Sequence, residues 1–301
     1  MTLIFALAFD HRNSFRRDFM KLSGDPTTQQ HRQMVAAKGV VVDALLLAGP
    51  RVDGGRPALL IDHEYGGGFV RRAQVGGILV AMPVEVSGQR ELRYLFRGAF
   101  GRVIERYDPD YAKVLVRYNP GGDATMNTRQ RDRLRELTAW LEGRRQQLML
   151  ELLVPAEGSQ LARVAGDRAR FDRELRAALT VCAIEEIAGD GICPHVWKIE
   201  GPEAPEDAQR VAAAVRAAGH GTCLVLGRGA DLGAVRRWLT VAAPTDGFTG
   251  FAVGRTLWWD GLRRLADGGD RGEAVMSIAE RYLSLVGDYL RVTRAGENQP
   301  R

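Results

Sequence analysis

One lysine lies in the middle of an apolar stretch, residues 194–202, which reads Pro-His-Val-Trp-Lys-Ile-Glu-Gly-Pro. The run before the Gly-Pro turn is typical of a short strand that is buried on both faces. Because burial of an unpaired ammonium is costly, Lys198 either has a carboxylate partner or functions as a neutral amine. A structural ion pair with Glu151 or Glu200 and a Schiff-base lysine are both compatible with this pattern.

Lysine is rare in this chain. The 42 basic residues include only four lysines, namely Lys21, Lys38, Lys113 and Lys198. Arginine supplies the other positive charges, but it stays protonated at usable pH and cannot form a Schiff base, whereas lysine can lose its proton and react. Lys113 and Lys198 both lie in strand-like runs, which makes them the candidates for chemistry.

Two turns later in the chain combine glycine with arginine: Gly227-Arg228-Gly229 and Gly254-Arg255. Glycine lets backbone N–H groups approach an anion, and the N-terminus of a following helix adds a favourable potential. A turn glycine followed by a solvated arginine gives the same pattern. Because two such pairs follow consecutive strand-like runs, opposite a buried lysine, we favour a phosphate site.

Short apolar runs alternate with helical periodicity along the whole chain. We predict strands at residues 3–9, 58–61, 77–84, 113–118, 148–154, 196–200, 223–226 and 250–253. We predict helices at residues 28–47, 69–75, 92–104, 128–145, 170–188, 208–218, 233–243 and 273–290. Such alternation indicates a parallel sheet with right-handed crossovers. Eight units in this length favour a single (β/α)8 TIM barrel over residues 1–292, with residues 293–301 as a flexible tail. An open doubly wound sheet is the alternative, but the first strand is not followed by G-x-G-x-x-G.

In a barrel, the residues at the carboxyl ends of the strands share one face, where catalytic groups gather. Strands five and six are neighbours, so we expect Glu151 close to Lys198. Lys198 and Glu200 are two residues apart and share a strand face. Lys113 lies lower on the fourth strand. Its ammonium would favour the neutral form of Lys198, and a neighbouring carboxylate can shuttle protons.

Composition restricts the class of protein. The chain of 301 residues is 45% hydrophobic and 26% charged. Its net charge is +5, and its basic and acidic residues are interspersed along the sequence, so we expect no nucleic-acid partner. The three cysteines and the scattered histidines have no metal-ligand spacing, and we expect no metal. The apolar opening residues lack a basic n-region, and we find no apolar run long enough to span a bilayer. We therefore expect a cytoplasmic protein without a membrane partner.

Several motifs, in order along nearly the whole chain, resemble the DUF2090 domain, which occurs alone or fused to the inositol-catabolic sugar kinase IolC. These motifs are Phe9-Asp10-His11-Arg12, Lys113-Val-Leu-Val-Arg117-Tyr118-Asn119-Pro120, Glu151-Leu-Leu-Val-Pro155, Val196-Trp-Lys198-Ile-Glu200-Gly201, Leu226-Gly-Arg228-Gly-Ala230-Asp231 and Gly250-Phe-Ala-Val-Gly254-Arg255-Thr256. The resemblance implies a 2-deoxy-5-keto-gluconate 6-phosphate aldolase that yields dihydroxyacetone phosphate and malonate semialdehyde.

The chain is more distantly similar to the class I tagatose 1,6-bisphosphate and sulfofructose phosphate aldolases, which are TIM barrels with a Schiff-base lysine. Their motifs match Asp10 and Arg12, Lys113, Glu151, and Lys198 with Glu200. The sequence departs from them at His11, where those relatives carry glutamine, and at Arg117-Tyr118-Asn119, where they carry tyrosine and aspartate. These departures concern the substrate rather than the lysine chemistry.

The resemblance and the residues together give a set of expected roles. Lys198 attacks the ketone of a phosphorylated sugar acid, no cofactor is needed, and Glu151 or else Asp10 shuttles protons. Lys113 and Arg117 place positive charge around the carboxylate or hydroxyls of the substrate, while Arg12 and Glu200 also contact the substrate. His11 is a substrate ligand or an ordinary polar loop residue. The phosphate is expected at the two Gly-Arg turns, formed by Gly227, Arg228, Gly229, Gly254 and Arg255.

Three alternatives remain open at this level. The enzyme could cleave another ketose phosphate, of the tagatose bisphosphate or sulfofructose phosphate type. The chain could be a non-catalytic sugar-phosphate-binding module that regulates a kinase, which would need the phosphate turns but neither Lys198 nor Glu151. A metal-dependent aldolase is the third, and the scattered histidines argue against it. Barrels of this sort often associate, so we expect a homo-oligomer.

Overall fold

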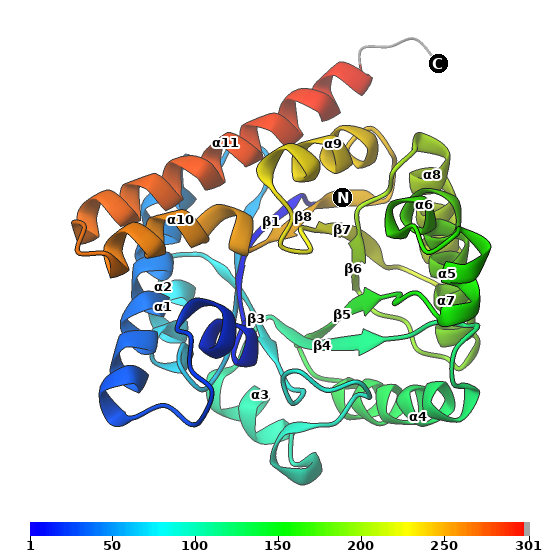
Figure 1. Cartoon of the computed structure of the whole chain (residues 1–301), viewed down its shortest axis with the longest axis horizontal. Coiled ribbons are helices and arrows are strands. Elements are labelled where there is room, and N and C mark those ends of the chain that lie inside the picture. Colours follow the sequence, from blue (N-terminus) through cyan, green and yellow to red (C-terminus); the bar gives the residue numbers. More distant parts are fainter. Residues whose placement is uncertain (298–301) are drawn as a thin grey trace.

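Eight parallel strands close into one barrel in the order in which they occur along the chain, β8 pairing back to β1 (Figure 1). The computed structural model describes residues 1–297. The strands are β1 Ile4–Phe9, β2 Arg56–Ile61, β3 Leu79–Pro83, β4 Tyr111–Arg117, β5 Gln147–Leu153, β6 Val196–Glu200, β7 Thr222–Leu226 and β8 Phe248–Val253. The predicted (β/α)8 barrel is thus confirmed, and every predicted strand overlaps an observed one.

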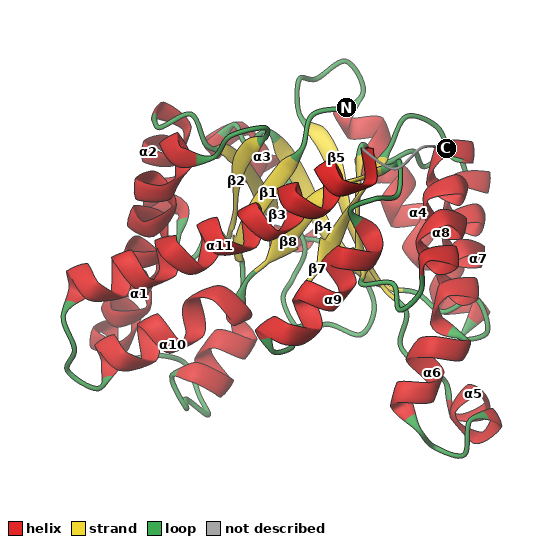
Figure 2. Cartoon of the chain, turned by 90° about the horizontal axis from the view of Figure 1, so that it is seen from above, coloured by secondary structure: helices red, strands yellow, loops and turns green. Residues whose placement is uncertain are grey.

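Helices surround the barrel and follow its strands (Figure 2). They are α1 Thr28–Ala48, α2 Val70–Val75, α3 Gly101–Tyr107, α4 Ala124–Leu141, α5 Gly158–Arg163, α6 Arg168–Glu174, α7 Arg176–Gly189, α8 Pro205–Ala217, α9 Leu232–Ala242, α10 Arg255–Ala266 and α11 Arg271–Glu297. Local signals start several of them. Thr27 and Gln30 form a capping box before α1, and the carboxylates of Asp123 and Asp231 cap α4 and α9.

The helix predicted at residues 92–104 is wrong. The start of this segment instead pairs antiparallel with the residues that follow β3. Glu85 pairs with Tyr94, and the Leu95 amide donates to the Val84 carbonyl at 3.0 Å. A short 3-10 turn, Leu95–Gly98, follows, and α3 begins only at Gly101. The apolar spacing looked helical, but pairing with the end of β3 satisfies the same backbone groups.

The other differences concern helix ends and short helices. The predicted helix at 170–188 is two helices, α6 and α7, separated at Leu175, and α5 and α10 were not predicted. The last helix extends through residue 293 to Glu297, so the start predicted for the tail at residue 293 is wrong. Residues 298–301 lie outside the described part of the chain.

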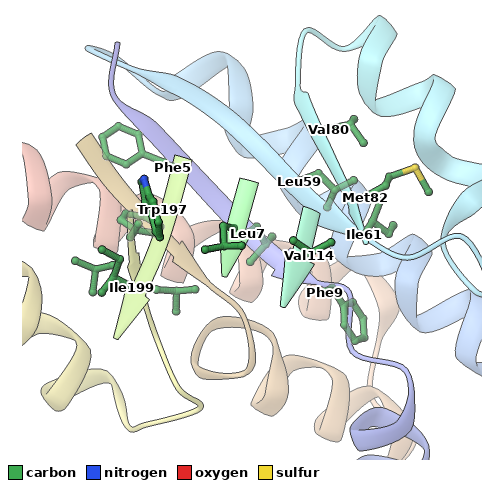
Figure 3. Packing of buried hydrophobic residues seen from close by; sticks show 14 of the residues in the cluster. Phe5, Leu7, Phe9, Leu59, Ile61, Val80, Met82, Val114, Trp197 and Ile199 are labelled. Carbon is green, nitrogen blue, oxygen red and sulfur yellow. The ribbon is translucent and has the colours of Figure 1, made fainter. Parts of the chain in front are cut away.

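The core has two layers, because successive strand residues face opposite sides. Outward residues such as Phe5, Leu7 and Trp197 pack between the strands and the helices, as Figure 3 shows. Inward residues fill the barrel below the site, and they are mostly small or unbranched, namely Ile4, Ala6, Ala8, Ala58, Leu60, Ala81, Tyr111, Met149, Val196, Leu224 and Ala252. This filled interior is the floor on which the site is built.

The inward alternation continues into charged residues. Asp10 follows Ala8 by two positions, Lys113 follows Tyr111, Glu151 follows Met149 and Lys198 follows Val196. Each of these side chains therefore points to the barrel axis, where the apolar floor ends. The strand pattern alone thus carries the charged groups to a common place.

Helix α1 and the turn after it, residues Thr28–Arg51, are long and apolar enough to meet a membrane-span criterion, with a mean hydropathy of 1.3. The prediction that no run reaches that length is therefore wrong by this criterion. Half of the most apolar part of this segment is buried inside the protein. Met34, Val41 and Leu45 pack in the strand–helix layer of the core. A core helix of a barrel passes the same test of length and composition.

Candidate active site

A cavity of about 530 Å³ opens at the carboxyl ends of the strands. Asp10, Lys113, Glu151 and Lys198 line its floor, and loops after β1, β3, β7 and β8 form its walls. This is the face on which enzymes with this fold place their chemistry. The sequence predicted the same four residues, with Lys113 lower on its strand than the others.

Lys198 pairs with Glu151 at the bottom of the cavity. The two residues are register partners on β6 and β5, and the Lys198 Nζ lies 2.9 Å from the Glu151 Oε1. Lys198 is 5% exposed and Glu151 is 8% exposed, yet both reach the cavity. Within residues 1–297, Glu151 is the only carboxylate in ion-pair distance of Lys198.

Lys113 has a different environment, although it contacts the same carboxylate. Its Nζ lies 2.9 Å from Asp10, 3.0 Å from Glu85 and 2.8 Å from the second oxygen of Glu151. An ammonium has three N–H donors, so three carboxylates satisfy it completely. Glu151 therefore bridges the two lysines. From the sequence, we expected a second ammonium near Lys198.

Charge outweighs burial in this cluster. Burial alone would lower the pKa of Lys113, but the fields of Asp10, Glu151 and Glu85 raise it well above its usual value. Burial would raise the pKa of Asp10 and of Glu151, yet attraction by Lys113 and Lys198 lowers the pKa of both carboxyls. Lys113 is therefore held as a cation, and Asp10 and Glu151 are held as anions.

Glu200 does not pair with Lys198 in the described part of the chain, so that version of a structural ion pair is wrong. Its Oε2 accepts hydrogen bonds from the Val154 amide at 2.9 Å and from Arg176 at 2.6 Å. Its Oε1 lies 3.3 Å from the Nε of Arg228. Glu200 lines the cavity, but its oxygens are directed into the wall formed by α6 and α7.

Arg228 belongs to the same wall. Its Nη1 donates to Asp172 at 2.8 Å, and Asp172 also pairs with Arg176, which closes a ring of two arginines and two carboxylates. Arg228 has a left-handed backbone, with φ at 49°, which is unusual outside glycine. The predicted contact of its guanidinium with a substrate therefore competes with two ion pairs.

The two glycine turns meet above β7 and β8. Arg255 lines the cavity and donates from Nη2 to the Arg228 carbonyl at 3.1 Å, which links the turns. Gly229 has φ at 72°, and a Cβ there would lie 2.4 Å from the Arg255 guanidinium. At Gly254, a Cβ would lie 2.2 Å from the Ala8 carbonyl oxygen. Gly227 and Gly254 also line the cavity, so backbone from both turns faces it.

Three further predicted residues lie on the opposite walls or beside Asp10. His11 packs edge-on against Trp258, and burial lowers the pKa of its imidazole to about 4, despite the nearby Asp10. Arg12 is 4% exposed and donates to the Glu85 carbonyl at 2.8 Å. Arg117 is half-buried and donates to the Gln89 carbonyl at 2.8 Å. All three line the cavity.

Sequence reasoning placed Glu85 at a strand end without a role, and it did not place Asp172 and Arg176 in the site. Glu85 follows β3 at the inward parity, which was a usable signal, and it contacts Lys113 at 3.0 Å. Asp172 and Arg176 lie on α6 and α7, far from any strand end in sequence, and no local pattern marks them. They reach the site only because these helices fold back over β6.

Lys38 is the third buried lysine, and it supports the end of β1 from behind. Its Nζ lies 2.7 Å from Asp62, donates to the His11 carbonyl at 3.0 Å and also donates to the Phe9 carbonyl. These two carbonyls flank Asp10. Lys38 is completely buried and does not line the cavity, so its role is to position the backbone around Asp10.

The chain is thus a closed (β/α)8 barrel, a fold that class I aldolases share. Its sequence belongs to the DUF2090 family, described as an uncharacterized protein conserved in bacteria, whose profile matches residues 1–292. No curated protein matches the chain.

Several solved structures resemble this chain in fold. Protein Cgl0159 from Corynebacterium glutamicum is 17% identical, with a TM-score of 0.57, over 94% of this chain and 86% of that one. Fructose-bisphosphate aldolase from Plasmodium falciparum is 13% identical, with a TM-score of 0.58, over 98% and 91%. An archaeal fructose-1,6-bisphosphate aldolase, in which the catalytic lysine binds the carbinolamine intermediate covalently, is 14% identical, with a TM-score of 0.53, over 95% and 94%. At these identities the likeness shows the shared fold.

Proposed function

We propose that this protein is a class I aldolase in which Lys198 forms the Schiff base. The observation that carries the proposal is the position of Lys198 on the floor of the cavity, 5% exposed, with its Nζ 2.9 Å from Glu151. A reacting amine needs access to a ketone, a group that takes its proton and protection from bulk water. Lys198 has all three.

The chemistry then follows from the amine. Glu151 accepts a proton from Lys198, and the neutral amine adds to the substrate ketone to give a carbinolamine. Loss of water yields a protonated imine. A base removes the proton of the hydroxyl two carbons away, the C–C bond breaks, and its electron pair moves to the imine to form an enamine. The aldehyde leaves, the enamine is protonated on carbon, and water releases the ketone and restores Lys198.

Lys113 and its carboxylates fix the charge around this amine. Because Lys113 remains a cation, it holds one oxygen of Glu151 and leaves the other directed at Lys198. Glu151 is the first candidate for the proton shuttle, and Asp10, which binds the same Lys113, is the second.

We propose 2-deoxy-5-keto-gluconate 6-phosphate as the substrate, as the family resemblance implies, in inositol catabolism. Cleavage between C3 and C4 would give malonate semialdehyde and dihydroxyacetone phosphate. The phosphate would bind at the turns of Gly227, Gly229 and Gly254, with Arg255 as the cation, since the Arg228 guanidinium is engaged by Asp172 and Glu200. Backbone N–H groups of these turns would contribute the remaining donors.

Borohydride trapping tests the mechanism. We expect incubation of the protein with dihydroxyacetone phosphate and borohydride to add one stable adduct, and peptide mass mapping to place it on Lys198. A panel of ketose phosphates then tests the substrate, because a tagatose bisphosphate or sulfofructose phosphate enzyme would release different aldehydes. An active preparation with no adduct on Lys198 would end the proposal. Ligand binding without any turnover would favour a regulatory module.

A further inference from the structure

Arg12 is a buried cation without a carboxylate partner. It is 4% exposed, and no carboxylate of the described residues lies within 4 Å of its guanidinium. Its Nη2 donates to the Glu85 carbonyl, and its Nε has no hydrogen-bond partner within residues 1–297. A buried charge normally has a counter-ion, because a dipole alone does not offset the loss of hydration. Arg12 lines the cavity, so the missing anion can come from a ligand.

Arg117 provides a second cation of the same kind. It lines the same cavity, donates to the Gln89 carbonyl at 2.8 Å and has no ion pair among the described residues. The segment that follows β3, residues 85–89, therefore holds Arg12 at one end and Arg117 at the other. Both guanidiniums are fixed by backbone carbonyls, which orient them without neutralising them.

The other cations of the cavity are already engaged. Lys113 binds three carboxylates, and Arg228 binds Asp172 and Glu200. The positive charge of Lys113, which was expected to surround the substrate carboxylate or hydroxyls, is thus already balanced by these carboxylates. The guanidiniums of Arg12, from the loop after β1, and of Arg117, at the end of β4, meet the segment after β3, whereas the glycine turns follow β7 and β8. Lys198 on β6 lines the same cavity.

We infer that Arg12 and Arg117 form a second anion subsite, which binds the carboxylate at the end of the substrate remote from the phosphate. This inference rests on the proposed function, because it assumes that Lys198 reacts between two charged ends. A guanidinium fork matches a planar carboxylate, often with two parallel hydrogen bonds. The nearby Glu85 carboxylate, whose Oε2 has no hydrogen-bond partner among the described residues, disfavours a doubly charged group such as a second phosphate.

The test distinguishes binding of the phosphate and ketone half of the substrate from binding of its carboxylate half. Dihydroxyacetone phosphate has the phosphate and the ketone but no carboxylate, so its borohydride trapping on Lys198 reports on the amine and the phosphate turns alone. We expect Arg12→Gln to lower kcat/KM for the keto acid phosphate by roughly 30- to 100-fold, as the loss of charged hydrogen bonds does. Trapping with dihydroxyacetone phosphate should stay within about threefold of the wild type.

Matched variants exclude a general loss of charge or of folding. Arg17 lies at the rim of the same cavity but pairs with Asp18 at 2.6 Å, so Arg17→Gln should change kcat/KM by less than about threefold. Arg117→Gln should act as Arg12→Gln does, with a smaller loss. Arg12→Lys keeps the charge without the fork, and should lose about tenfold on the keto acid phosphate if Arg12→Gln fails to fold.

Each result has one meaning. Failure of the wild type to trap dihydroxyacetone phosphate would remove the proposed function. Normal trapping with unchanged kcat/KM in Arg12→Gln and Arg12→Lys would remove only the carboxylate subsite. Equal loss of trapping and cleavage would also overturn it, since Arg12 would then act through the shared framework. If the wild type prefers a bisphosphate or a sulfonated ketose phosphate, and Arg12→Gln reduces that preference, the subsite binds a different anion and the carboxylate assignment is wrong.

Discussion

Lys113 and Lys198 touch the same carboxylate, yet they occupy opposite kinds of environment. Lys113 contacts three carboxylates at 2.8–3.0 Å and is 1% exposed. Lys198 contacts one carboxylate, among the described residues, and lines the open cavity. The first arrangement engages all three N–H donors of the ammonium, whereas the second leaves Lys198 with one anionic partner and access to the cavity. The number of surrounding carboxylates therefore distinguishes Lys113 from Lys198, the lysine that we propose to react.

The difference is produced by strand order. Lys113 on β4 is one layer lower than Glu151, because its register partner on β5 is Met149. Its side chain reaches upward between Asp10, Glu85 and Glu151, which come from β5 and from just after β1 and β3. Lys198 stands level with Glu151, and its other neighbour in register is the apolar Leu224. Only one side of Lys198 is thus charged.

The largest expected effect comes from Lys198. Lys198→Met should lower kcat by at least about 10⁴-fold and abolish borohydride trapping, because no other group forms the imine. Thermal unfolding should change little, since Glu151 keeps its pairing with Lys113. Lys198→Arg, which preserves the charge, should lose as much activity. An active Lys198→Arg variant would contradict the distinction between the two lysines.

Lys113 should matter most for stability. Lys113→Met leaves Asp10, Glu85 and Glu151 buried without their shared cation, so we expect a loss of about 3–5 kcal/mol in the free energy of unfolding. Urea titration at pH 7 measures it. The loss should shrink toward pH 4, where carboxylates without a cation take up protons. A variant as stable as the wild type would show that this cluster is not held by Lys113.

The His11 imidazole gives a pH dependence beside the same cluster. Its pKa in the folded state is about 4, below its ordinary value, so the unfolded chain binds the proton more readily between pH 6.5 and 4. Stability should therefore fall by about 1–3 kcal/mol as pH drops through this range. His11→Gln should remove that part of the fall in urea titrations. The exposed His31 supplies the control variant, and an unchanged slope in His11→Gln would refute the assignment.

Glu85 should have the smallest effect. Glu85→Gln removes one of the three anions around Lys113 but keeps an oxygen that accepts a hydrogen bond, so we expect a loss of about 1 kcal/mol in stability. Trapping on Lys198 should not change. A loss of trapping in Glu85→Gln would mean that Lys113 and Lys198 respond as one unit, and the contrast between them would have to be abandoned.

Much of this architecture follows from local patterns. The strands are apolar runs that end at glycine, proline or charged residues, and each predicted strand overlaps an observed one. The inward parity of Asp10, Glu151 and Lys198 follows from the period of two along a strand. The proximity of Glu151 and Lys198 follows from adjacent strands in register. These features need only information from neighbours along the chain and from strand order.

The wrong predictions occur where segments far apart in the sequence compete for the same hydrogen-bonding or charged groups. Residues 92–104 have helical spacing, but residues 93–95 pair with residues 84–86, just after β3, instead. Glu200 was a possible partner of Lys198 because they share a strand face, yet Arg176 and Arg228 take its oxygens. Neither outcome has a signal within the segment concerned, because the competing partner lies on another helix or loop.

The amino-acid sequence by itself determined a barrel, the strands that form it and the inward position of Lys198 beside a carboxylate, since strand period and strand order are local properties. Only the tertiary structure decided which charged side chains form ion pairs with one another. Three carboxylates from β5 and from just after β1 and β3 satisfy Lys113, helices α6 and α7 engage Glu200 and Arg228, and Arg12 is buried without a described carboxylate partner. Ion pairing depends on distances of a few ångströms between segments far apart in the chain, and folding alone sets those distances.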